Sequence, residues 1–380
     1  MTAVKGFAPQ IRRKQSTFSM MMEVTACLLL VYLVSLIFYS VKVGPEYGLK
    51  VVFNGLSAVG FAVLADCLWY LPVLFRKDQE KKAYEYFYRI GHSYSYVSGL
   101  ILVLLLPVGI QWWEIAVTAL LSILVMKLCF GGFGSNILNP AVFGRVFAQL
   151  AFAKDLTTYL GTKPADFSVA TGASVTGQIN AANGFSALNS LSLGDLFLGN
   201  YRGALGETCA LLLILIGIYL SVRKIIDWRV PVFYVLSLYL SFVLLFLTAG
   251  DGGWAFKDAL SYTLVGGILF GGVFCLTDPV TSPTSRSGRV IFALGAALLT
   301  LLLRVYTASP EGVAYSILFL NVLVPLIDHV IKGRTRRKLV PTLTCAVLGV
   351  LLVIFSLSYG ATHKIDPATL KYVAQIGEGF

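Results

Sequence analysis

Long apolar segments constrain the fold of this chain more than any other feature. Eleven of them occupy residues 18–41, 51–75, 94–110, 114–130, 136–152, 204–222, 230–249, 258–276, 290–306, 312–331 and 340–359. Only 13% of the residues are charged, about half the fraction usual in soluble domains. Because backbone in lipid must satisfy its own hydrogen bonds, we expect an all-α polytopic membrane protein with about 10–11 transmembrane helices. Disordered, coiled-coil and disulfide-scaffold classes are excluded by the same composition.

The basic residues predict how the chain crosses the membrane. With a cytoplasmic N-terminus and eleven crossings, 19 of the 30 Lys and Arg residues lie in cytoplasmic connections and 9 lie outside. Cytoplasmic loops normally carry this excess, so the polar connection 153–202 and the C-terminus are predicted to lie outside. We therefore attribute the net charge of +11 to the excess of Lys and Arg in the cytoplasmic loops. The expected partner is the lipid bilayer, and no nucleic acid is expected.

Five parts follow from this topology. We expect a cytoplasmic N-terminus, a first membrane repeat, an extracytoplasmic loop, a second membrane repeat, and an extra C-terminal transmembrane helix with a tail. Their boundaries are 1–17, 18–152, 153–202, 203–338 and 339–380.

Two polar segments interrupt the apolar pattern and echo one another. Residues 131–145 read GGFGSNILNPAVFGR, and residues 271–289 read GGVFCLTDPVTSPTSRSGR. Each has a Gly-Gly pair, then Asn-Pro or Asp-Pro, then Gly-Arg, about 140 residues apart. Five predicted spans separate the two segments, so the halves would insert in opposite senses. This pattern predicts two inverted repeats with broken half-helices.

Four polar residues in these segments are the main candidates for a functional site. They are Asn136, Asn139, Arg145 and Asp278. Close helix packing explains the glycine pairs, but it does not explain amide and charged side chains, which are costly in lipid and usually functional. We therefore predict that these four side chains line a functional or cofactor site.

The remaining polar residues allow weaker interpretations. Asp66, Glu207 and Asp278 are candidates for an ion site, and Glu207 is equally typical of a helix N-terminus. Arg286 and Arg289 are interpreted as solvated cytoplasmic charges, and Arg304 as an interfacial side chain that reaches the headgroups. The six cysteines lack metal-ligand spacing and are interpreted as packing residues, although pairing across helices, above all of Cys129, stays open. No catalytic residues and no metal site are predicted.

Together the motifs resemble a specific family. The two segments above occur with DLFLG at 195–199, GET at 206–208, PEGVA at 310–314 and NVLVPLID at 321–328. In this order they resemble the RnfD subunit of Rnf-type ion-translocating electron-transport complexes, with the NqrB subunit of the Na⁺-translocating NADH:quinone reductase as the close second. The resemblance runs over residues 8–338. It implies a subunit of a translocase in a prokaryotic cytoplasmic (inner) membrane, with other membrane and redox subunits as partners.

The resemblance also implies flavin. In this family FMN is joined through its phosphate to a Ser/Thr-Gly-Ala-Thr/Ser motif on the outer face, in a reaction carried out by an FMN transferase. Thr171, Gly172, Ala173 and Ser174 stand in that place, and Ser174 is the predicted acceptor, with Thr171 and Thr176 as alternatives. A second, non-covalent flavin such as riboflavin is implied as well, with the segments around Asn139 and Asp278 as its walls.

Two alternatives stay open at this point. The acceptor is Ser rather than the commoner Thr, and Ser168 stands where the family usually has an acid. A flavin-less structural subunit of such a complex is therefore one alternative. The other is an inverted-repeat secondary transporter or channel without a redox role. The sequence does not choose between Na⁺ and H⁺ as the coupling ion.

Overall fold

The computed structural model describes residues 16–75, 82–153, 156, 193–198, 203–249, 255–306, 312–331 and 339–362, and their regular secondary structure is entirely helical. The first half contains α1 (Thr17–Phe38), α2 (Pro45–Tyr70), α3 (Lys82–Ser93), α4 (Ser95–Leu105), α5 (Trp112–Ile123) and α6 (Pro140–Ala151). The second half contains α9 (Leu193–Leu198), α10 (Ala210–Val222), α11 (Arg229–Ala249), α12 (Ala255–Leu264), α13 (Ile268–Phe270), α14 (Arg286–Tyr306) and α15 (Gly312–Ile331), and α16 (Leu339–Thr362) follows. Single π-helical turns extend α1, α5 and α13 over Tyr39–Val43, Leu124–Leu128 and Gly271–Cys275.

Local sequence signals fix where the helices break. Tyr94 adopts a left-handed conformation, with φ of 52°, between α3 and α4. Gly266 and Gly267, with φ of 76° and 74°, separate α12 from α13. Glycine reaches this region without the steric cost that other residues incur. These left-handed residues mark the break between α3 and α4 in the first half and the break between α12 and α13 in the second half.

Each of the eleven predicted apolar segments contains a helix, and the prediction of an all-α polytopic membrane protein is confirmed. Among the described residues, six helices are long and apolar enough to cross a membrane, and α12 with the following helix to Cys275, bent by 66°, would make a seventh. Helices α4, α5, α6 and α10 have 11, 12, 12 and 13 residues, fewer than the roughly 20 that span a bilayer. A full crossing by each of these segments, including 136–152, stays a prediction.

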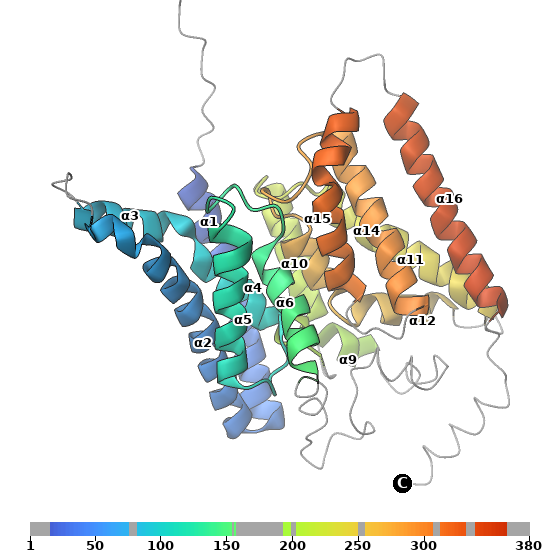
Figure 1. The fold of residues 1–380 in the computed structure, drawn as a ribbon. Helices are drawn as coiled ribbons and strands as arrows, with labels where there is room; N and C mark the ends of the chain where they lie inside the picture. Colours follow the sequence, from blue (N-terminus) through green and yellow to red (C-terminus); the bar gives the residue numbers. More distant parts are fainter. Residues whose placement is uncertain are drawn as a thin grey trace, which may run out of the picture.

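The two halves repeat one packing order. Helix α2 packs against α3, α4 and α5, and α5 packs against α6; in the same way α11 packs against α12, α13 and α14, and α14 packs against α15. Helix α3 lies across the upper end of α2, and α12 lies across the lower end of α11 (Figure 1). The repeats are therefore related by inversion, as inverted-topology transporters are.

The spacing of the repeats differs from the one that the sequence predicts. Helices α6 and α15 begin at Pro140 and Gly312, so equivalent positions lie 172 residues apart rather than about 140. Residues 131–139 precede α6, whereas residues 276–285 precede α14, the equivalent of α5. The two segments look alike because both are irregular backbone among helices, and glycine and proline suit that conformation.

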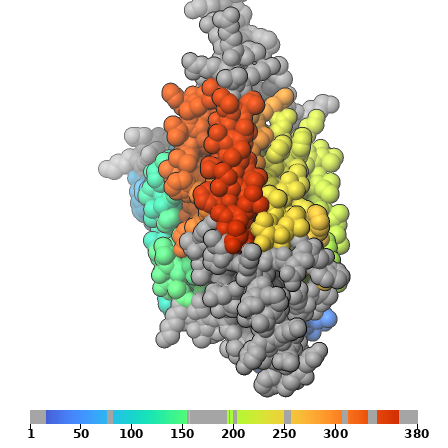
Figure 2. Space-filling model, turned by 90° about the vertical axis from the view of Figure 1, so that its right-hand side faces the viewer, coloured from blue at the N-terminus to red at the C-terminus, as the bar shows by residue number. Residues whose placement is uncertain are grey.

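Helix α16 stands outside the repeats. It packs against α11 and α14, and it covers the centre of the face in Figure 2. Its outward residues are apolar and exposed, with Leu343, Val347, Val350 and Ile354 each more than half uncovered. Such a face is suited to lipid or to a neighbouring membrane subunit.

Candidate functional site

A cavity of about 460 Å³ lies between the two repeats, near the end of the bundle at which α1 begins. We call it the interrepeat pocket. Its first-repeat wall comes from the start of α1, from Tyr94 and α4, and from the residues between Lys127 and Pro140, and its second-repeat wall comes from the end of α10 and from the segment Val273–Val280. Its polar side chains include Lys127, Asn136, Asn139, Thr277 and Asp278, and its aromatic ones are Tyr94, Phe133 and Phe274.

Three of the four predicted site residues meet in this pocket. Asn136, Asn139 and Asp278 all line it, although 139 residues separate Asn139 from Asp278 in the chain. The fourth, Arg145, is buried in α6 with 7% of its surface exposed, and it does not line the pocket. The structure therefore brings together three polar residues from both irregular segments, and Arg145 lies outside the pocket that they line.

Asn139 holds the first segment in place. Its Oδ1 caps α6 by accepting the N–H groups of Ala141 and Val142 at 3.1 and 3.4 Å, and Pro140 follows at the first helical position, where its missing N–H costs nothing. Its Nδ2 donates to the carbonyl of Cys275 at 3.5 Å. One amide therefore starts a half-helix in the first repeat and touches the π-helical turn of the second.

Asp278 shapes the second segment in a similar way. Its Oδ1 accepts the N–H of Val280 at 3.2 Å, and its Oδ2 accepts the hydroxyl of Thr281 at 3.2 Å. Asp followed by Pro often makes such a local turn, because the carboxylate replaces a backbone acceptor. The carboxyl group stays at the pocket wall.

Asn321 joins the two segments from α15 and was not predicted as a site residue. Only 1% of its surface is exposed. With its amide oriented to suit its neighbours, it accepts the Asn139 N–H and donates to the Thr281 carbonyl, both at 3.2 Å. Amide orientation is assigned from such partners. An amide in the middle of an apolar helix was the sequence signal for this residue.

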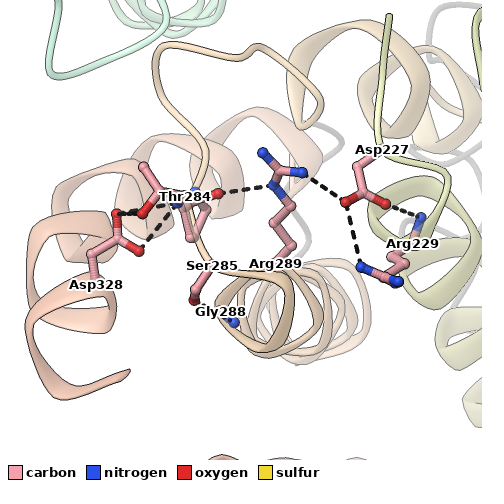
Figure 3. Close-up of polar contacts among 8 residues, drawn as sticks. Asp227, Arg229, Thr284, Ser285, Gly288, Arg289 and Asp328 are labelled. Carbon is pink, nitrogen blue, oxygen red and sulfur yellow. Dashed lines mark hydrogen bonds and ion pairs between the residues drawn. The ribbon is translucent and has the colours of Figure 1, made fainter. Parts of the chain in front are cut away.

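A polar cluster clamps the chain that follows Asp278 (Figure 3). On one side Asp328 of α15 accepts the N–H of Thr284 at 3.1 Å and its hydroxyl at 3.0 Å. On the other side Arg289 donates to the Pro283 carbonyl at 2.9 Å and to Asp227 at 2.7 Å. Arg289 is thus a structural ion-pair partner and not the solvated charge that the sequence predicts, whereas Arg286 is exposed.

The electrostatics of Asp227 follow from this clamp. Burial alone would raise the pKa of its carboxyl. Hydrogen bonds from Arg289 and from the Arg229 backbone, together with the charges of both guanidinium groups, outweigh burial and hold the pKa of Asp227 below its ordinary value. The carboxylate therefore stays ionised and keeps Arg289 against the loop.

The prediction for Arg304 is wrong. Its side chain is 1% exposed and donates to the carbonyls of Tyr262, Val265 and Gly266. The guanidinium thereby caps the carbonyl end of α12 at the break of the second repeat. The inverted fold places the end of α14 against this break, inside the protein. Arg304 therefore does not lie at the lipid surface, although it is near the end of an apolar span.

Glu207 lies at the same break. It is the last residue of a 3-10 turn, Leu205–Glu207, ahead of α10. A methyl group on Gly267 would come within 2.9 Å of the Glu207 Oε1, so this carboxyl packs closely against the glycine. Glu207 does not line the interrepeat pocket. Asp66 does not line the pocket either, and its carboxyl accepts the Ser93 hydroxyl at 2.9 Å.

The predicted flavin motif lies outside the described residues. Thr171, Gly172, Ala173, Ser174 and Thr176 all belong to the stretch 157–192, whose structure is not described. Covalent attachment is therefore a prediction from the sequence. The described residues contain no group of His, Cys, Asp or Glu that would hold a metal ion, and all six cysteines are free thiols.

Comparisons with known proteins now give the family. The sequence profile of the NQR2, RnfD, RnfE family matches residues 4–337. The chain belongs to this family. It is 31% identical over 329 residues to the D subunit of the Na⁺-translocating ferredoxin:NAD⁺ oxidoreductase complex of Acetobacterium woodii, covering 86% of this chain and 93% of that protein.

Other relatives carry related names. The D subunit of the proton-translocating ferredoxin:NAD⁺ oxidoreductase complex of Clostridium ljungdahlii is 35% identical, over 64% of this chain and 75% of that protein. The B subunit of the Na⁺-translocating NADH-quinone reductase of Ectopseudomonas mendocina is 33% identical, over 64% of this chain and 61% of that protein. The resemblance seen in the sequence motifs is therefore confirmed, with RnfD as the better match.

Proposed function

We propose that this chain is a flavin-carrying membrane subunit of an Rnf-type ion-translocating oxidoreductase complex. Its family and its relatives support the assignment to a multi-subunit complex of this type. The observation that carries the flavin proposal is the convergence of Asn136, Asn139 and Asp278, from both repeats, on one pocket of about 460 Å³. A cavity of this size suits a small organic cofactor.

The residues of the pocket fit a flavin ring. Tyr94, Phe133 and Phe274 offer aromatic surface for a flat ring, and aromatic groups favour offset or edge contacts of this kind. Asn136 uses its Nδ2 on the Leu138 carbonyl at 3.3 Å, which leaves its Oδ1 as an acceptor toward the pocket. Lys127 supplies a donor, and the Thr277 hydroxyl, which itself donates to the Val273 carbonyl, supplies an acceptor. Such groups match the alternating N–H and carbonyl edge of an isoalloxazine.

The chemistry divides between cofactor and protein. A bound flavin would supply electron transfer in one- or two-electron steps. The chain would hold the ring between the repeats, exclude water from it and place fixed charges beside it. The clamp formed by Asp227, Arg289 and Asp328 would keep the Asp278 wall in position. Electrons would arrive from and leave to partner subunits.

A second flavin belongs to the same proposal. We place FMN on Ser174 as a phosphoester made by an FMN transferase, with Thr171 or Thr176 as alternative acceptors. The distribution of Lys and Arg supports an extracytoplasmic position for this loop and a cytoplasmic (inner) membrane location for the chain. Names of the relatives support both Na⁺ and H⁺ as the coupling ion.

One experiment tests both flavins. The full chain is purified after co-expression with an FMN transferase and is precipitated with acid, which releases only non-covalent flavin. We expect flavin in both fractions. Ser174→Ala should empty the pellet and leave the supernatant unchanged. Asn136→Ala should weaken retention of soluble flavin about 3- to 10-fold, the effect of one hydrogen bond, and leave the pellet unchanged.

Each variant is the control for the other. Loss of both flavins in both variants would indicate misfolding, which a third variant, Asn54→Ala, checks. Asn54 is a buried amide of α2 that donates to Val108 at 3.1 Å, away from the pocket. Wild-type chain without flavin in either fraction would overturn the proposal and favour a flavin-less structural subunit.

A further inference from the structure

A buried polar cluster lies behind the interrepeat pocket. It consists of Asp66 from α2, Ser93 and Ser95 on either side of the break between α3 and α4, and Lys127 from the π-helical turn after α5. Their exposed fractions are 1%, 2%, 1% and 3%. Two opposite charges are therefore held inside an apolar bundle, where such groups are costly and usually functional.

Hydrogen bonds run through the cluster in one direction. Ser93 Oγ donates to Asp66 Oδ1 at 2.9 Å and lies 3.1 Å from Ser95 Oγ. Lys127 Nζ donates to Ser95 Oγ at 3.0 Å and to the Ser93 carbonyl. The serines thus stand between the carboxylate and the ammonium, and no direct ion pair between Asp66 and Lys127 occurs in this described part of the chain.

Lys127 faces the pocket as well as the cluster. It is one of the lining residues, together with Asn136 and Asp278, and its Nζ lies 5.8 Å from the centre of the Phe133 ring, a pocket wall. A lysine ammonium has three N–H donors. Ser93 and Ser95 take two, and within the described residues no acceptor takes the third.

We propose that Lys127 contacts the bound flavin and sets its reduction potential, and that Asp66 acts through Ser93 and Ser95 as the positioning residue of this cation. The inference rests on the flavin proposed for this pocket. An electron from a redox partner adds negative charge to the ring, and a fixed cation in a water-poor site favours that charged form strongly. The buried carboxylate behind the cation offsets part of its field.

Because Lys127 and Asp66 carry opposite charges, removing each charge should shift the flavin midpoint potential in the opposite direction. Lys127→Met should shift the flavin midpoint potential to a more negative value, because the reduced ring loses its cation. Asp66→Asn should shift it to a more positive value, because the cation is no longer offset. Lys127→Arg retains the charge and should stay close to wild type. A role in packing alone does not predict opposite shifts.

The test uses the full chain in detergent, in a Ser174→Ala background, with riboflavin as the added probe. Acid precipitation first confirms that no covalent flavin remains, so the titration reports one flavin. We expect shifts of at least 30 mV, equivalent to a tenfold change in the equilibrium of a two-electron couple. Asp258→Asn, the same chemical change in α12 outside the pocket, should leave the potential unchanged.

The outcomes separate this inference from the proposal beneath it. If the background chain retains no riboflavin, the flavin proposal itself fails. If riboflavin is retained and Lys127→Met and Asp66→Asn leave the potential unchanged or move it in the same direction, the role of Lys127 is overturned. If Lys127→Met does not fold, Asp66→Asn and Lys127→Arg still test the role of Lys127. Asp66→Asn should shift the potential to a more positive value, and Lys127→Arg should leave it close to wild type.

Discussion

At the scale of single residues, two buried cations occupy related places in the two repeats. Lys127, at the end of the helix that begins with α5, donates to the carbonyl of Ser93, the last residue of α3. Arg304, near the end of α14, donates to the carbonyls of Val265 and Gly266 after α12. Positive charge near a helix C-terminus is favourable. Each repeat thus stabilises its broken helix with a cation from an equivalent neighbouring helix. This is the helix that begins with α5 in the first repeat and α14 in the second.

A first prediction concerns Arg304. Arg304→Met should leave the carbonyls of Val265 and Gly266 without donors in the protein interior, at about 1–3 kcal/mol for each group. We expect a clearly lower thermal unfolding midpoint for the purified chain in detergent, with Arg304→Lys in between because it keeps the charge. Equal midpoints for wild type and Arg304→Met would show that the contacts contribute no stability.

Some of these buried polar residues could be predicted from the sequence, and others could not. Asn136, Asn139 and Asp278 were found because amide and acidic groups are rare in apolar segments. Lys127 and Arg304 were not, because a basic residue near the end of a span normally reaches the headgroups. Only the inverted packing, which turns these helix ends inward against the breaks, distinguishes a capping cation from an interfacial one.

At the scale of elements, irregular segments position the site and regular helices hold them. Asn139 and Asn321 link residues 139, 275 and 281 by side-chain hydrogen bonds to backbone. The existence of the eleven helical segments could be predicted from apolar length. The spacing of the repeats could not, because Gly-Gly and X-Pro mark irregular backbone wherever it occurs and are therefore poor guides to equivalence.

A second prediction follows from the clamp in Figure 3. The folded-state pKa of Asp227 is lowered, so the carboxylate stabilises the fold fully above its unfolded pKa of about 4. This contribution is lost as the pH falls through the folded value. Asp227→Asn should therefore lower the unfolding midpoint at pH 7, and its difference from wild type should shrink below about pH 4.

The control for this measurement is Glu85→Gln. Glu85 pairs with Arg89 on the surface of α3 at 2.6 Å, and exposed pairs of this kind contribute little. Its midpoint should follow the wild-type value across the pH range. A difference between wild type and Asp227→Asn that stays constant down to pH 3 would contradict the assigned ion pair.

At the scale of the whole molecule, our proposal places its two flavins toward opposite ends of the bundle. The interrepeat pocket lies near the end at which α1 begins and α10 ends. The loop with Ser174 connects the end of α6 to α9, and both lie toward the opposite end of the bundle in Figure 1. Electrons passing between the two positions would have to cross most of the membrane along this chain or its partners.

This arrangement makes a last prediction about sidedness. In a cysteine-free background, Asn183→Cys in the polar loop and Lys50→Cys near the start of α2 should react with an impermeant maleimide in intact cells. Lys224→Cys, in the exposed turn between α10 and α11, should react only after the cells are permeabilised. All three follow from one orientation, set by the excess of Lys and Arg on the cytoplasmic side. Labelling of Lys224→Cys in intact cells, with Asn183→Cys protected, would invert the molecule and move the proposed FMN site to the cytoplasm.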